Sequence, residues 1–121
     1  MFYAAFDFVY LHSQASSIVK FNGLNFPEWS EQVQFHLGVL DLDLTLLTDK
    51  PTAITETSSV EQSSFHKTWE RSNRLSLMLM RMTMTESIRS TIPKTDDAKK
   101  FLESVESMSQ SDRLISQLLG H

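Results

Sequence analysis

The sequence predicts an all-α protein, a small helical bundle of about five helices. Apolar side chains recur with a period of 3.6 residues in three separate stretches, which places them on one face of a helix. Hydrophobic residues make up 40% and charged residues 21% of the 121 residues, as in a globular domain. We expect one helical domain over residues 20–121. Because its last apolar stretch reaches the end of the chain, we expect that domain to be incomplete at its C-terminus.

The first helix of the domain is expected over residues 27–40. Pro27 suits the first helical position, because the N–H that proline lacks would have no partner there. One face of this helix carries Trp29, Val33, His36, Leu37 and Leu40. Residues 41–47 then alternate Asp and Leu, which suits either a strand or a further helical turn. A lone strand would have no partner in this sequence.

A long helix is expected after a loop rich in Ser and Thr at residues 48–59. A capping box can start it at Ser58 with Glu61 or at Ser59 with Gln62, and its end is expected near residue 82. One side carries Phe65, Trp69, Ser72, Ser76, Leu79, Met80 and Thr83. The opposite side carries Lys67, Arg71, Arg74 and Arg81, within an arc of about 80°. The second half is apolar nearly all round, as in the central helix of a bundle.

The C-terminal part predicts shorter elements. Residues 86–92 form a helical turn that Pro93 stops, and Thr95 can cap the next helix with Asp96 and Asp97 in its first turn. That helix carries an apolar stripe of Ala98, Phe101, Leu102, Val105 and Met108. We expect a separate short helix from Ser111, with Leu114, Ile115, Leu118 and Leu119.

Residues 1–19 differ in character from the rest and are expected to form an irregular leader, poorly ordered or loosely docked on the core. Their aromatic and β-branched residues could also make a short strand. The first cation is Lys20, so the positive start of a secretory signal is missing. The apolar run is also shorter than the roughly 20 residues that span a bilayer. We therefore expect no membrane partner.

The residues that would carry catalysis or bind a metal are scarce. The chain has no cysteine and three glycines, which argues against thiol chemistry, zinc fingers and glycine-rich phosphate loops. Its four histidines are not paired at helical spacing, and His36 suits a core or interface position. Adjacent carboxylates such as Asp96 and Asp97 do not face each other on a helix. We expect no enzyme, no cofactor, no metal and no small-molecule substrate.

The candidate structural core comprises Trp29, Leu37, Phe65, Trp69, Leu79, Phe101 and Val105. The basic stripe of Lys67, Arg71, Arg74 and Arg81 has three interpretations: a solvated face, a patch for RNA phosphates, or a contact with an acidic surface of another subunit. Among the methionines, Met80 and Met84 suit the core. Met78 and Met82 lie toward the basic side and are candidates for contacting a partner.

Three segments together resemble the Gag polypeptides of plant copia-type LTR retrotransposons. The first is F-N-G-L-N-F-P-E-W at residues 21–29. The second is W-E-R-S-N-R-L-S-L-M-L-M-R-M-T-M at residues 69–84. The third runs through E-S-I-R-S-T-I-P-K-T at residues 86–95 and A-K-K-F-L-E-S-V-E at residues 98–106. In order and spacing the resemblance covers about residues 21–112, most of the chain.

The resemblance implies a structural protein, because such Gag chains assemble into virus-like particles that package element RNA. The matching part is the helical, capsid-like region, in which Trp29 and Trp69 would be core anchors. The family's zinc knuckle needs cysteines, which are absent, so a truncated or domesticated fragment is expected. The implied function is capsid-like association with itself or with other Gag-like chains, in the cytoplasm. The alternative is a single-stranded RNA-binding module that uses the basic stripe.

Overall fold

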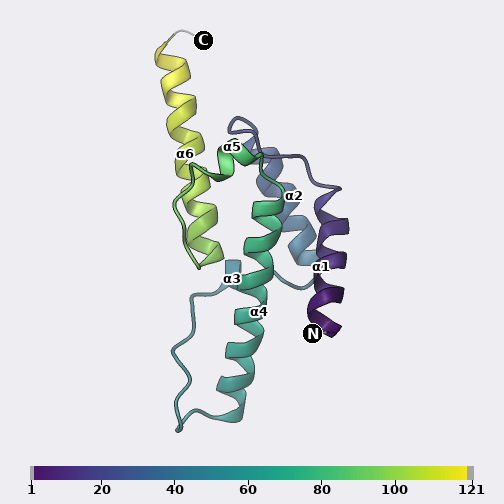
Figure 1. Cartoon of the computed structure of the whole chain (residues 1–121). Helices are drawn as coiled ribbons and strands as arrows, with labels where there is room; N and C mark the ends of the chain where they lie inside the picture. The colour runs from purple at the N-terminus through teal and green to yellow at the C-terminus, as the bar shows by residue number, and fades with distance from the viewer. Residues whose placement is uncertain (1, 120–121) are drawn as a thin grey trace.

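The structure is a computed structural model, and it describes residues 2–119. Over these residues the chain is all-α, as the sequence predicts, with six helices and no strand. They are α1 (Phe2–Ala15), α2 (Phe26–Val39), α3 (Leu44–Leu47), α4 (Val60–Met82), α5 (Glu86–Arg89) and α6 (Ala98–Leu118). The four long helices form the body of the molecule, and α3 and α5 are single turns within the connections (Figure 1).

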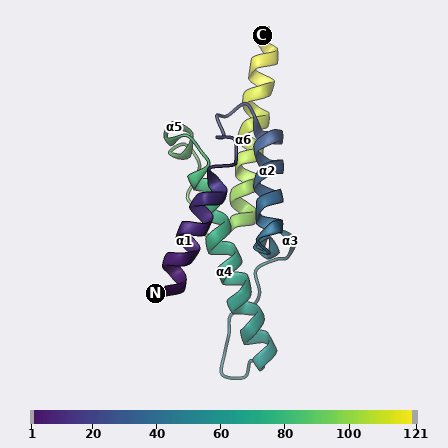
Figure 2. The same ribbon diagram turned by 90° about the vertical axis from the view of Figure 1, so that its right-hand side faces the viewer.

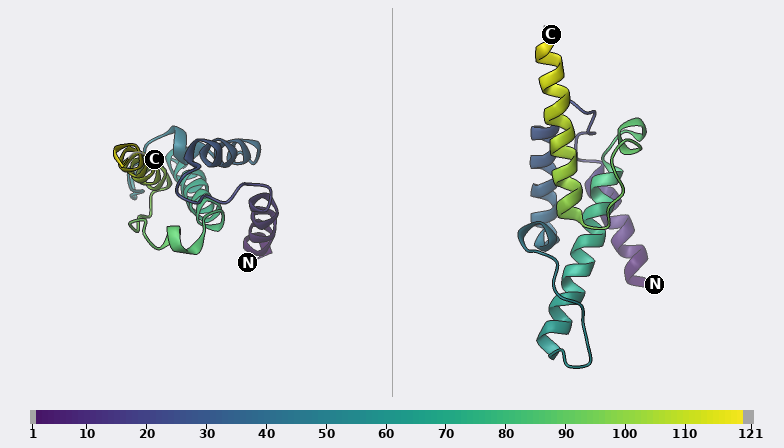
Figure 3. Two further views of the ribbon diagram at one scale, coloured as in Figure 1. Left: turned by 90° about the horizontal axis from the view of Figure 1, so that it is seen from above. Right: turned by 90° about the vertical axis from the view of Figure 1, so that its left-hand side faces the viewer.

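Helix α4 is the centre of the bundle, as its apolar second half predicts. Helices α1, α2, α3 and α6 all pack against it. Seen from above, α4 lies between α1 on one side and α6 on the other, with α2 beside it (Figure 3). The view in Figure 2 shows that α4 and α6 extend in opposite directions beyond the remaining helices. Each of these two long helices therefore has one end outside the packed body.

The start of the chain corrects one expectation. Residues 1–19 are not an irregular leader, because α1 covers Phe2–Ala15, and they form no strand within the described residues. Leu11, Ala15 and Ile18 recur at i, i+4 and i+7 and are all buried in the core. Gln14 Oε1 also lies 2.6 Å from His36 Nδ1, which ties α1 to α2. A buried apolar stripe and a polar tether hold this helix on the bundle.

A cluster of three aromatic rings joins the α1–α2 connection to the end of α4. Phe21, Phe26 and Trp29 pack with ring centroids 5.0 to 6.3 Å apart. The backbone of Phe21 forms an isolated parallel bridge with Met84, and its N–H donates to Thr83 O at 2.8 Å. Trp29 Nε1 donates to Thr83 Oγ1 at 2.8 Å. The buried indole is thereby both packed and hydrogen-bonded.

Helix α2 ends in a tight turn that sends the chain into α3. Leu42 N–H donates to Leu37 O, and Asp41 N–H donates to Gly38 O. Asp41 takes the left-handed conformation at φ 58°, which aspartate tolerates better than most residues. Residues 41–47 thus form a turn and the short helix α3, so the helical alternative is right and the strand is wrong. Ser72 Oγ donates to Leu42 O and accepts from Thr45 N–H, which fixes α3 on α4.

Helix α4 starts at the second of the two capping boxes. Ser59 Oγ accepts from Gln62 N–H at 3.0 Å, and Gln62 Oε1 accepts from Ser59 N–H at 2.8 Å. No residue from 60 to 68 is buried, whereas most residues from Trp69 to Met80 are. The core assignment of Phe65 is therefore wrong, since its side chain is 42% exposed. The first two turns of α4 extend past the helices that would have covered it (Figure 1).

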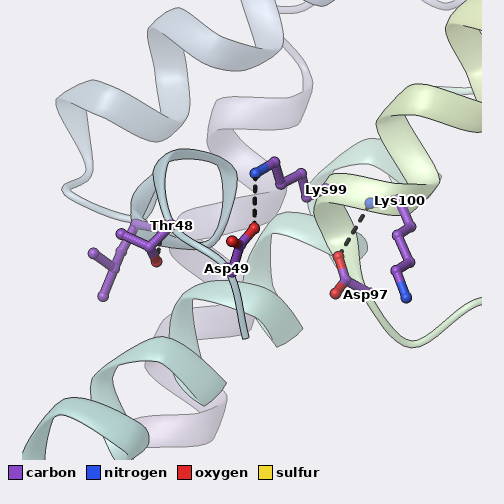
Figure 4. Close-up of polar contacts among 6 residues, drawn as sticks. Thr48, Asp49, Asp97, Lys99 and Lys100 are labelled. Carbon is purple, nitrogen blue, oxygen red and sulfur yellow. Dashed lines mark hydrogen bonds and ion pairs between the residues drawn. The ribbon is translucent and has the colours of Figure 1, made fainter. Parts of the chain in front are cut away.

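Helix α6 begins later and runs further than the sequence suggests. Asp97 caps its first turn, since Asp97 Oδ1 accepts from Lys100 N–H at 3.0 Å (Figure 4). Thr95 Oγ1 accepts from Asp97 N–H at 3.2 Å, which lies before the helix begins. Lys99 Nζ lies 3.2 Å from Asp49 Oδ1 and links α6 to the chain after α3 (Figure 4). The helix is continuous to Leu118, so no separate helix starts at Ser111. Neither Gly nor Pro occurs between residues 98 and 118 to break it.

Candidate association surface

The predicted core residues other than Phe65 are buried. Trp29, Leu37, Leu79 and Val105 are fully enclosed, and Trp69 and Phe101 are nearly so. Met80 and Met84 are buried, while Met78 and Met82 are partly buried against the same core. None of these side chains presents a large surface to a partner. An association surface has to come from other residues.

The basic stripe is divided by the fold. Lys67, Arg71 and Arg74 are exposed on the outer face of α4. Arg81 is half-buried instead: its guanidinium donates to Thr95 O at 3.1 Å and lies 5.4 Å from the centre of the Phe101 ring. Val60, 86% exposed, falls on the same helical face as the three outer cations. We call Val60, Lys67, Arg71 and Arg74 the α4 stripe.

A second stripe lies on the outer face of α2. Phe35 and Val39, four residues apart, are 65% and 66% exposed. Glu31 and Glu28 are exposed on the same face, one and two turns before Phe35. We call these four residues the α2 stripe; at 100° per residue they fall within an arc of about 80°, opposite the buried Val33 and Leu37. The 3.6-residue period of the buried face does not reveal this outer face; its signal in the sequence is the two large apolar residues, Phe35 and Val39, that lie off the buried face.

The two stripes are complementary in charge and in order. Along α2 the carboxylates come first and the apolar side chains follow, whereas along α4 the apolar Val60 precedes the cations. An antiparallel pairing of the two faces would set Glu28 and Glu31 against Arg71 and Arg74, and Val39 against Val60. The stripes rise about 17 Å and 21 Å along their helix axes, a difference of less than one helical turn. Both stripes face outward, so this pairing would join two separate copies of the chain.

Two other features, a metal-binding cluster and a membrane-spanning helix, are absent from the described residues. Over residues 2–119, no cluster of three or more His, Asp or Glu side chains has the geometry to hold a metal ion. None of the helices in the described part of the chain has the length and apolar character needed to cross a membrane.

Comparison with protein-family models, with curated proteins and with solved structures finds no match. The resemblance to copia-type Gag therefore stays a prediction from the sequence. The structure does give its first motif a physical role. Gly23 is buried and takes φ 94°, and a Cβ there would lie 3.2 Å from Ile88 Cδ1. Asn22 and Asn25 hold the neighbouring backbone with side-chain hydrogen bonds, and Phe21, Phe26 and Trp29 form the aromatic cluster.

Proposed function

We propose that this chain is a non-catalytic assembly domain that associates with further copies of itself, in the manner of the capsid-like region of a copia-type Gag. The contact joins the α2 stripe of one copy to the α4 stripe of the next. Such a contact is heterologous, because each copy contributes a different surface to its two neighbours. Repetition of a heterologous contact builds rings or open chains of subunits, which is what a shell-forming protein requires.

The observation that carries the proposal is the matched order of charge and apolar surface on the two exposed stripes. Phe35 and Val39 offer large apolar side chains that their own bundle leaves in water. The flanking carboxylates and the cations of α4 would set the register of the contact and exclude pairings of like charge. The chain is acidic overall, with a net charge of −4. Three cations on one helical face are therefore a local feature that an acidic partner surface can recognise.

The alternative use of the α4 stripe is binding of single-stranded RNA. Such sites combine cations with aromatic side chains that stack on the bases. Phe65 lies on the side of α4 opposite the cations, and Trp69 is only 2% exposed, so neither ring is available to stack on a base. The stripe thus offers phosphate contacts without a stacking platform. Self-association accounts for both stripes, whereas RNA binding accounts for one, so we favour self-association. We place the domain in the cytoplasm, in keeping with its cysteine-free sequence.

Light scattering coupled to size exclusion tests the proposal with two variants of the full chain. In the first, Glu28→Lys and Glu31→Lys reverse the charge of the α2 stripe. In the second, Lys67→Glu and Arg71→Glu reverse that of the α4 stripe. We expect concentration-dependent oligomers from the wild type and monomers from each variant alone. An equimolar mixture should associate again, because the native α4 stripe of the first variant meets the native α2 stripe of the second, and the two reversed stripes also carry opposite charges.

Two results would count against the proposal. A wild type that stays monomeric over the whole concentration range would remove self-association. Oligomers that persist in both variants would place the contact elsewhere on the surface. The matched control is Glu103→Lys with Lys100→Glu on α6, which reverses exposed charges outside both stripes and should leave assembly unchanged. Co-elution of the wild type with oligouridylate that high salt abolishes would favour the RNA alternative.

A further inference from the structure

A pocket lies between the end of α4, the short helix α5 and the connection that leads into α6. Its volume is about 720 Å³, within the range of ligand-binding pockets. Ile92 and Phe101, both buried, and Pro93 line it with apolar surface. Arg81, Arg89 and Lys94 line it with three cations, against the single carboxylate of Asp96. This pocket can take an apolar group beside a negative charge.

A second, smaller pocket adjoins the first along α4. Its volume is about 350 Å³, and it shares Arg81 and Asp96 with the first pocket as wall residues. Trp69 and Leu77 line it, together with the cations Lys50 and Arg74 and the carboxylate of Glu70. The two pockets therefore form one groove, centred on Arg81, that follows α4 between Trp69 and the α5–α6 connection. Trp69 and Arg81 are about 18 Å apart along the helix axis, the length of five or six residues of extended chain.

The indole of Trp69 supplies an independent observation about this groove. Among the buried side-chain nitrogen and oxygen atoms of the described residues, its Nε1 is the one without a hydrogen-bond partner. A buried donor without an acceptor costs free energy, and tryptophan N–H groups in protein interiors usually find a partner. The backbone of a bound peptide is rich in carbonyl acceptors. A small shift of the indole toward a carbonyl in the second pocket would satisfy it.

Arg81 is held in position where the two pockets meet. One of its terminal nitrogens donates to Thr95 O, and its guanidinium plane lies against Phe101. Arg89 Nη1 donates to Arg81 O, which keeps a second guanidinium close to the same turn of α4. A guanidinium fixed by packing loses little freedom when it binds a carboxylate. The geometry thus favours a carboxylate over a neutral group.

We propose that this groove binds an acidic peptide segment of a partner protein. An apolar side chain enters the larger pocket, a neighbouring Glu or Asp carboxylate meets the cations around Arg81, and a backbone carbonyl accepts from Trp69 Nε1. Charge complementarity selects this occupant: the first pocket has three cationic wall residues and one anionic one. Arg74 belongs to both this groove and the α4 stripe, but the charge reversals that test self-association leave Arg74, Arg89 and Lys94 in place, so the two proposals are tested separately.

The test is an NMR titration of the full chain, uniformly labelled with ¹⁵N, below the concentration at which it associates. The probe is the peptide acetyl-Gly-Leu-Glu-(Gly)5-amide, whose five glycines span about 17 Å and so reach from Arg81 to Trp69. The matched control is acetyl-Gly-Leu-Gln-(Gly)5-amide. We expect the acidic peptide to bind about fivefold or more tightly than the neutral one, the scale of one exposed ion pair. The Trp69 indole resonance, assigned with Trp69→Phe, should move downfield as it gains an acceptor, while that of Trp29 should stay.

Substitutions at exposed positions complete the test. Lys94→Gln and Arg89→Gln should each weaken binding of the acidic peptide by about fivefold and leave the affinity for the neutral peptide unchanged. Lys67→Gln removes the same charge from the same protein outside the groove and should have no effect. The proposal is overturned if both peptides bind equally, if the Trp69 resonance does not move at saturation, or if all three variants behave alike. Circular dichroism confirms that each variant keeps its helices.

Discussion

The two tryptophans stand in contrasting regions of the same bundle. Trp29 lies in an aromatic cluster at the end of α4, with its indole N–H bonded to a hydroxyl that is itself bonded to the backbone of α4. Trp69 lies where α4 enters the bundle, equally buried but with its N–H unpaired. In the first region, no buried side-chain nitrogen or oxygen of the described residues lacks a hydrogen-bond partner. The second leaves a donor and several cations beside a groove, so burial alone does not show what a tryptophan is for.

The largest expected effect comes from removing the satisfied tryptophan. Trp29→Ala should lower the free energy of unfolding by about 3–5 kcal/mol, because it leaves a large cavity among Phe21, Phe26 and α4. Chemical denaturation followed by circular dichroism measures it. Phe35→Ala on the same helix is the control, since that side chain is 65% exposed and should matter little. A loss below about 1 kcal/mol would show that the aromatic cluster is not a centre of stability.

Replacing each indole by a phenyl ring sharpens the comparison. Trp29→Phe loses a buried hydrogen bond and leaves Thr83 Oγ1 without its donor, whereas Trp69→Phe removes an N–H that has no partner. We expect Trp29→Phe to cost about 1–2 kcal/mol more than Trp69→Phe. Thermal melts of the two variants side by side give this difference. Equal costs would mean that Trp69 Nε1 has an acceptor in solution.

A smaller effect is expected at the exposed start of α4. Ser59→Ala removes the side-chain acceptor of the capping box and should destabilise the protein by about 1 kcal/mol. Ser59→Asp keeps an acceptor and adds a charge that suits a helix N-terminus, so it should restore the loss. Hydrogen exchange of the amides at residues 60–63 reports the local fraying. Unchanged protection in Ser59→Ala would contradict the role of the box.

The smallest effect is expected at Phe65. Because its side chain is 42% exposed, Phe65→Ala should cost about 1 kcal/mol or less, well below Trp29→Ala. A loss of stability above about 3 kcal/mol would place Phe65 in a core after all.

Local sequence patterns predicted most of the fold, and the predictions that were wrong have physical causes. The 3.6-residue period located α2, α4 and the first turns of α6 to within a residue or two, because an apolar stripe must be buried. It misplaced Phe65, since a period shows which side of a helix is apolar but not how far the neighbouring helices extend. It missed α1 because the aromatic residues at the start of the chain suit helix and strand alike.

The candidate surfaces were harder to predict than the core. The sequence predicted that the cations of α4 form a stripe. Arg81 is half-buried and lies apart from the exposed cations because it contacts Thr95 and Phe101, which only the tertiary fold brings close to it. The α2 stripe and the unpaired Trp69 N–H depend in the same way on which faces the fold covers. A sequence names the residues that can interact, and packing decides which of them remain available.

The junction between the chain before α2 and the end of α4 also sets the order of events during synthesis. Trp29 donates to Thr83, 54 residues later in the chain. A ribosome adding about 5–20 residues per second needs roughly 3–10 s to make that stretch, while a helix forms within microseconds. Until α4 is synthesised, the apolar faces of α1 and α2 therefore have no helix to pack against. The newly made chain must be guarded from premature aggregation until α4 has emerged.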